Sequence, residues 1–111
     1  MSRLRKQTLD GQIETLLLAT LEEGPSYGYQ IVKDLNERAG DLLRLGEGTV
    51  YPVLHRMEER GVLSCSWRKG DRGQPRKYYR LNARGKKALA EQRQQWAGLQ
   101  QVMNTVLGNP A

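Results

Sequence analysis

The spacing of apolar residues changes at Gly61, and this change limits the fold more than any other feature of the chain. Before Gly61, apolar residues recur every three or four positions, which is the period of an amphipathic helix. After it, strand-forming residues dominate two short segments, 62–68 and 77–81, and in the second they alternate with charged ones. The segment between them, 69–76, is basic and rich in turn-forming residues. The sequence therefore predicts helices followed by a β-hairpin with a basic tip.

Three helices are predicted before the hairpin and one after it. They are expected at about 11–22, 27–38, 49–60 and 83–106. Asp10 and Ser26 are expected to cap the first two, and Asn82 the last. Pro52 is expected in the first turn of the third helix, where a proline removes no hydrogen bond. This order predicts a mainly α winged helix-turn-helix domain at 1–82, and a C-terminal dimerisation helix with a short tail at 83–111.

Positive charge is concentrated in one third of the chain. The net charge is +6, but residues 68–93 alone carry ten Lys or Arg against two acidic residues, a net +8. A polyphosphate partner favours such a segment, because each neutralised phosphate releases condensed counterions. Charge alone leaves a second interpretation open, a solvated surface that keeps the protein soluble.

Several other classes of protein are disfavoured by what the sequence lacks. It has no catalytic motif, no set of metal ligands and no apolar run long enough to cross a bilayer. We therefore expect no enzymatic activity, no cofactor, no metal and no membrane segment. Cys65 is the single cysteine, which suits a reducing cytoplasm, and is interpreted as packing rather than as a redox sensor. His55, the single histidine, is interpreted as a DNA contact rather than a metal ligand.

The predicted topology places polar and basic residues where duplex DNA would lie. The third helix can enter the major groove, while the hairpin tip lies on the backbone or in the minor groove. The start of the second helix offers backbone N–H groups to a phosphate. The candidate contacts on these elements are Ser26, Tyr27, Thr49, Tyr51, His55, Arg56, Lys69, Arg72, Arg76 and Lys77. Packing at the helix junction remains an alternative role for Tyr27 and Tyr51.

Ordered motifs across residues 11–96 resemble the PadR family of transcriptional regulators. The matching segments are 24–31 (GPSYGYQI), 48–58 (GTVYPVLHRME), 61–63 (GVL) with Trp67, 76–81 (RKYYRL), and Gly85, Leu89 and Trp96. Val50, Met57 and Asn82 depart from the family pattern but keep its hydrophobicity or capping ability. The single C-terminal helix resembles the short subgroup of the family.

The resemblance implies a dimeric repressor that binds a pseudo-palindromic operator and sometimes releases it on binding a small molecule. It adds Tyr29 to the candidate DNA contacts and supports Tyr27, Thr49, Tyr51, His55, Arg76 and Lys77. In some short members, paired tryptophans of the last helix line a pocket for flat aromatic compounds. Trp96 is the matching residue here, with plain packing at the interface as its alternative.

The last helix has an apolar stripe that its own domain is too small to cover. At 1.5 Å per residue it would be roughly 36 Å long. Apolar residues recur at heptad spacing, although Gln92 interrupts the pattern. The predicted dimer interface consists of Leu89, Trp96, Leu99, Met103 and Val106. Such a two-fold dimer would place two recognition helices about 34 Å apart, one turn of DNA. The alternative is a helix folded back on its own domain.

Two other functions compete with DNA regulation. A winged helix can serve protein or RNA contacts, which would need fewer basic residues in the hairpin. A purely structural dimerisation module would leave the charge of 68–93 unexplained. The DNA interpretation accounts for both the topology and the charge.

Overall fold

The computed structural model describes Leu4, Leu9 and residues 11–108. Asp10, predicted to cap the first helix, lies outside the described residues. The elements are α1 (Ile13–Thr20), η2 (Leu21–Glu23), β1 (Ser26–Tyr27), α2 (Gly28–Ala39), η3 (Gly40–Leu42), α3 (Glu47–Glu59), β2 (Leu63–Lys69), β3 (Pro75–Leu81) and α4 (Ala83–Leu107). The predicted order of three helices, a hairpin and a long helix is confirmed, and this is a winged helix-turn-helix. We call the hairpin, residues 63–81, the wing.

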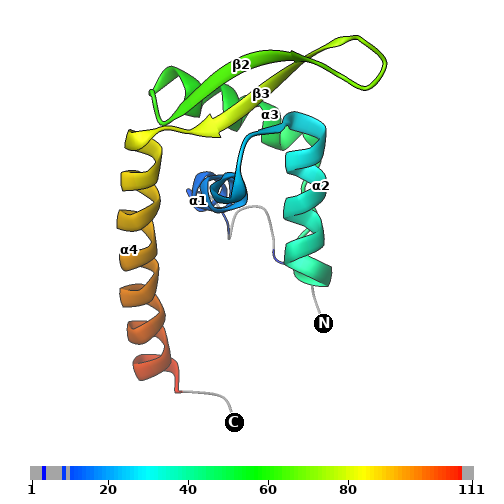
Figure 1. Cartoon of the computed structure of the whole chain (residues 1–111). Coiled ribbons are helices and arrows are strands. Elements are labelled where there is room, and N and C mark those ends of the chain that lie inside the picture. The colour runs from blue at the N-terminus through cyan, green and yellow to red at the C-terminus, as the bar shows by residue number, and fades with distance from the viewer. Residues whose placement is uncertain (1–3, 5–8, 10, 109–111) are drawn as a thin grey trace.

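The helices and the sheet form two layers around one core. Figure 1 shows the sheet above α1 and α2, with α3 behind it. The tip of the wing reaches past α2, and α4 descends on the opposite side of the molecule. The side chains most completely buried come from α1, η2, α2 and α3, and are Leu17, Leu21, Ile31, Val50, Leu54 and Met57. They lie on the apolar faces that the helical spacing predicts, because each helix buries one stripe against its neighbours.

A third strand, β1, was not predicted. Ser26 pairs with Tyr79 and Tyr27 with Tyr78 in antiparallel register, giving the sheet order β1-β3-β2. The prediction that Ser26 caps the second helix is therefore wrong. The cap position belongs to Tyr27, whose backbone is extended and whose side chain makes no capping hydrogen bond. Backbone pairing with β3, and not a capping side chain, therefore fixes the residues that lead into α2.

Helix α3 begins two residues before the predicted start, at Glu47. Pro52 is therefore inside the helix and not in its first turn, which corrects the prediction. Its missing N–H would have bonded to the carbonyl of Gly48, and both residues are exposed, so water can solvate that carbonyl. The predicted buried face is confirmed, and consists of Val50, Val53, Leu54 and Met57.

A buried amide fixes the loop that leads into α3. The Nδ2 of Asn36 donates to the carbonyl of Leu45 at 2.7 Å, and its Oδ1 accepts from the N–H of Leu45 at 2.8 Å. Asn36 is 9% exposed, so both hydrogen bonds replace water. The amide thereby ties the end of α2 to the approach of α3 and sets where α3 starts.

The first turn of α4 packs closely on Val62, the residue before β2. Asn82 caps the helix as predicted, since its Oδ1 accepts from the N–H of Gly85 at 2.9 Å. A Cβ on Gly85 would lie 2.2 Å from the carbonyl oxygen of Val62. Leu89 is 2% exposed and belongs to the core of its own chain. The prediction that Leu89 lies in the dimer interface is therefore wrong.

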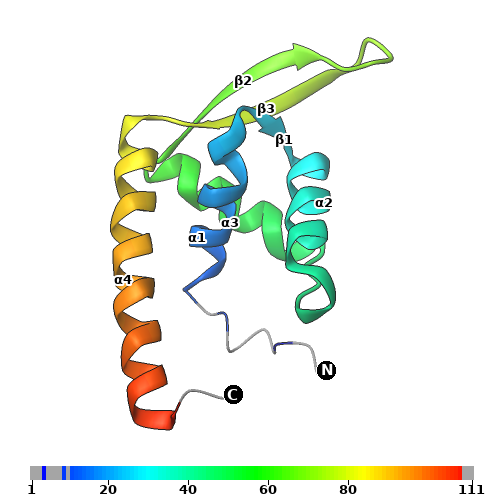
Figure 2. The same cartoon turned by 60° about the horizontal axis from the view of Figure 1, so that its bottom comes forward.

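Beyond Arg93, α4 extends past the body of the domain. Figure 2 shows its first half beside α1 and its second half extending past it. Arg93 forms an ion pair with Glu22 at 2.7 Å, and Oγ1 of Thr15 donates to Oε1 of Gln92 at 3.3 Å. Gln92 therefore interrupts the heptad pattern at a position that faces α1. Residues 90–108 are all exposed. Across the described residues, no helix combines the length and apolar character that crossing a bilayer requires.

Candidate nucleic-acid interface

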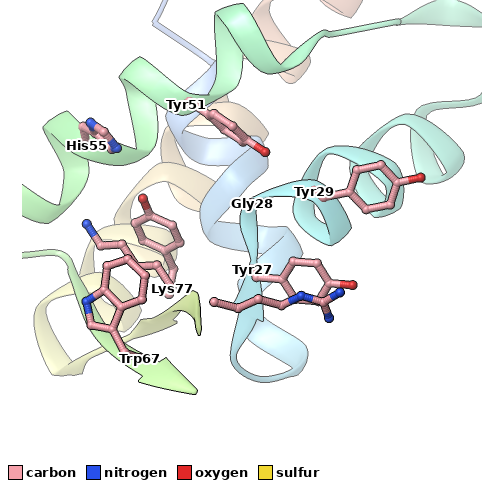
Figure 3. A pocket seen from close by; sticks show the side chains of 9 residues that line it. Tyr27, Gly28, Tyr29, Tyr51, His55, Trp67 and Lys77 are labelled. Atoms are coloured by element: carbon pink, nitrogen blue, oxygen red, sulfur yellow. The ribbon is translucent and has the colours of Figure 1, made fainter. Parts of the chain in front are cut away.

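The start of α2, the exposed side of α3 and the wing enclose an open cleft of about 490 Å³. Figure 3 shows that its side chains come from all three elements. The lining residues are Tyr27, Gly28, Tyr29, Tyr51, His55, Trp67, Arg76, Lys77 and Tyr79. The fold thus brings six of the eleven predicted contacts together, Tyr27, Tyr29, Tyr51, His55, Arg76 and Lys77, in one place. We call this space the wing cleft.

The other five predicted contacts lie outside the wing cleft. Arg56 is exposed on α3, and Thr49 is half-buried in its first turn. Lys69 and Arg72 are exposed at the end of β2 and in the turn of the wing. Ser26 is held in β1, opposite Tyr79. Four of the five, Ser26 excepted, therefore flank the cleft on α3 or at the wing tip.

Tyr51 packs at the helix junction, which is one of the two roles that the sequence left open, while its contact with DNA stays a prediction. Its ring packs against the start of α2, since a Cβ added to Gly28 would lie 2.6 Å from Cε1 of that ring. Tyr51 is still 37% exposed and lines the wing cleft, with its hydroxyl directed toward the start of α2 beside Gly28 (Figure 3). Partial burial, and then the nearby carboxylate of Glu47, raise the pKa of Tyr51. At neutral pH the hydroxyl is therefore protonated and can donate a hydrogen bond.

Lys77 ties the wing to α3. It lies on the inner face of β3, where its Nζ donates to Oε1 of Glu58 at 2.7 Å. The hydrogen bond raises the pKa of Lys77 and lowers that of Glu58, so both are charged at neutral pH. The neighbouring thiol of Cys65 has a pKa raised by burial to about 11 and is protonated there. Lys77 thus lines the cleft with its charge already paired.

Two surface residues of the wing were missed as candidates. Trp67 is 68% exposed and lies opposite Lys77, so it shares the inner face and lines the wing cleft. Arg68 is exposed on the outer face, opposite Arg76. Their signal in the sequence is the strand alternation, but it identifies faces only once the register is known. Alternation does predict that one of Tyr78 and Tyr79 is buried, and Tyr79 is 5% exposed.

The residues that the structure describes form no cluster of metal ligands. Among them, no three His, Cys, Asp or Glu side chains gather closely enough to hold one. The chemistry of the wing cleft is instead that of hydroxyl, imidazole, indole and guanidinium groups on a concave surface. Such groups bind phosphates, sugars and base edges.

The fold and the wing cleft define a class, the winged helix proteins with a basic and aromatic surface beside the third helix. Residues 17–91 match the Transcriptional regulator PadR-like family, and the chain belongs to that family. This confirms the resemblance found in the sequence motifs.

Relatives and solved structures agree with this membership. A PadR family transcription regulator from Clostridium difficile R20291 has 37% identity and a TM-score of 0.78, covering 88% of this chain and 100% of its own. A transcriptional regulator from Clostridium thermocellum has 27% identity and a TM-score of 0.82, covering 92% and 96%. Transcriptional regulator Rv3488 of Mycobacterium tuberculosis is 40% identical over 65 residues, 59% of this chain and 57% of that protein.

Proposed function

We propose that this protein represses transcription by binding a pseudo-palindromic DNA operator as a homodimer. The observation that carries the proposal is the wing cleft, because it lies between an exposed recognition helix and a basic wing. In this arrangement α3 enters the major groove, with Tyr51, His55 and Arg56 toward base edges or phosphates. The wing, with Lys69, Arg72 and Arg76, lies against the adjacent backbone or minor groove.

The second half of α4 supports a homodimer. Within residues 90–108 it exposes six large apolar side chains, Trp96, Leu99, Val102, Met103, Val106 and Leu107. At 100° per residue they fall within an arc of about 140°, which we call the apolar stripe. A second copy of the same helix is the simplest cover, because a two-fold axis makes the stripe complementary to itself. Residues 83–111 are then the dimerisation segment, and 1–82 the DNA-binding domain.

Trp96 gives this dimer a site for an effector. Its side chain is 55% exposed on the apolar stripe, next to the last residues that pack on the domain. Two copies related by the dimer axis would present two indole faces, and flat aromatic molecules stack on such surfaces. We propose that a ligand of this kind, bound between the helices, changes their spacing and releases the operator.

Binding to a fluorescent duplex from the region upstream of the protein's own gene tests the proposal. A scrambled duplex of equal length and composition is the control, and both are titrated across a salt series. We expect tighter binding to the upstream duplex and a steep fall in affinity as salt rises, since phosphate contacts release counterions. If no genomic fragment were bound more tightly than the scrambled duplex, the proposed DNA regulation would be contradicted, and binding to another protein would become the favoured function.

Replacing Gly28 with alanine is expected to weaken operator binding about tenfold, or ~1.4 kcal/mol. The new Cβ would lie 2.6 Å from the ring of Tyr51, so the ring must move and its hydroxyl leaves its place in the cleft. Stability changes little, because a partly exposed ring can shift. The measurement is operator affinity in a double-mutant cycle with Tyr51→Ala. In the Tyr51→Ala background, Gly28→Ala should not lower operator affinity further, because the ring is already absent. If Gly28→Ala lowered affinity equally in both backgrounds, Gly28 would not act by leaving room for the Tyr51 ring.

A further inference from the structure

Two arginines and two tyrosines form a continuous stack across the three strands. The guanidinium of Arg76 lies 4.3 Å from the ring centroid of Tyr27, and that of Arg68 lies 4.6 Å from the centroid of Tyr78. The two rings are 5.4 Å apart and tilted by 59°. The stack thus joins β1, β3 and β2. We call these four residues the wing stack.

The register places most of the wing stack on the outer face of the sheet. Tyr79 is buried beneath the sheet, so its neighbour Tyr78 faces outward. Tyr27 lies opposite Tyr78 in the ladder, and Arg68 lies opposite Arg76. Tyr27 and Arg76 also line the wing cleft, so the stack runs from the cleft margin onto the outer face. It is therefore continuous with the proposed DNA surface.

Arg68 and Arg76 are a directly opposed pair of like charges. Such cross-strand pairs destabilise a sheet unless something offsets the repulsion. Among the described residues, neither guanidinium forms an ion pair with a carboxylate, whereas Lys77 on the inner face is paired with Glu58. Each tyrosine ring contacts one guanidinium group through a cation–π interaction, which leaves the N–H groups of that guanidinium free to donate hydrogen bonds to an anion. An anion between or beside them would turn repulsion into attraction.

We propose that the wing stack binds the phosphodiester backbone of duplex DNA, with Arg68 and Arg76 as its phosphate ligands. Tyr27 and Tyr78 act as positioning residues that orient the two guanidinium groups. This inference rests on the proposed function and extends it. The duplex contacts the outer face of the wing in addition to the cleft and the wing tip. Arg68 becomes a DNA ligand that neither the charge pattern nor the family motifs single out.

The test compares Arg68→Gln with Arg80→Gln. Both remove one positive charge from exposed outer-face positions of the wing, but only Arg68 belongs to the stack. In the full-length protein we expect Arg68→Gln to lower affinity about tenfold at low salt. It should also reduce the slope of log K against log salt by about 0.9, the value for one lost phosphate contact. Arg80→Gln should change the slope much less. Equal slopes for the two variants would overturn the proposal.

Variants of Tyr78 test the positioning role. Tyr78→Phe keeps the ring and should bind duplex as the wild type does, whereas Tyr78→Leu removes the π face and should weaken binding about as much as Arg68→Gln. In the Arg68→Gln background, Tyr78→Leu should add little further loss through this contact. Equal affinity of the Phe and Leu variants, with melting temperatures unchanged, would show that the ring does not orient Arg68.

Inorganic phosphate distinguishes a DNA backbone from a free anion. At constant ionic strength, sodium phosphate should raise the melting temperatures of the wild type and of Arg68→Gln by the same small amount relative to sodium chloride, through its general effect on burial. A saturable rise that disappears in Arg68→Gln would make free phosphate the ligand and overturn the DNA assignment. If the wild type prefers no duplex over a scrambled one, the proposed operator function fails. The slope difference on scrambled DNA still tests the wing stack in that case.

Discussion

Replacing Leu99 and Val106 together with glutamate is expected to leave a folded monomer whose operator affinity is at least about 100-fold lower. Both side chains are exposed in the protomer, at 47% and 76%, so the substitutions disturb no packing within it. In the proposed dimer they would bring carboxylates together in an apolar interface, which is strongly unfavourable. A monomer binds one half-site and loses the effective concentration that a second linked half-site supplies.

Light scattering and duplex binding on the same samples measure this effect. The matched control is Gln94→Glu with Gln101→Glu, which adds the same charge to the opposite side of α4. The control should remain dimeric and bind DNA nearly as the wild type does, with a small loss from added negative charge. If the Leu99 and Val106 variant stayed dimeric, the apolar stripe would not be the interface.

Replacing Gly85 with alanine is expected to destabilise the protein by about 2–3 kcal/mol, which lowers the melting temperature by roughly 10–20 °C. The added Cβ would meet the carbonyl oxygen of Val62 at 2.2 Å and Cδ2 of Leu81 at 3.1 Å. The carbonyl belongs to the backbone and cannot rotate away as a side chain can. Helix α4 must therefore shift away from Val62, and this shift also strains the Asn82 cap.

Gly98→Ala in the same helix is the control. Nothing lies within 4 Å of a Cβ at that position, so alanine should stabilise the protomer by up to about 1 kcal/mol through helix propensity. Thermal unfolding followed by circular dichroism compares the two variants. Equal melting temperatures would mean that α4 does not need its close approach to Val62.

The helices were predictable because each buries one periodic face. Val50, Val53, Leu54 and Met57 show this most clearly, since all four are buried as their spacing requires. The start of α3 was placed too late because Gly48, a poor helix former, follows Gly46 in an apparent loop. β1 escaped prediction because two residues are too few to show alternation. Its partner strand lies about 50 residues further along the chain.

The sequence predicted most of the residue types at the candidate site, but not which face of the wing each residue occupies. Strand alternation shows that Trp67 and Arg68 face opposite sides, but not which side meets α3. That follows from the register with β3, which the turn at Gly70–Gln74 sets. The interface prediction failed at Leu89 for a similar reason. Heptad spacing occurs on both sides of Gln92 and does not distinguish the two halves of α4, whereas the burial of each half depends on where α1 lies.

Selection of bound duplexes from a random library tests the central claim most directly, because the protein itself selects its operator from all possible sequences. Helix α3 of each protomer should read one half-site, and the two-fold axis should relate the two half-sites. We predict that the protein, as the proposed dimer, enriches an inverted repeat whose half-site centres lie about one helical turn, roughly 34 Å, apart. Recovery of sequences no more alike than the starting library would contradict sequence-specific DNA binding by this protein.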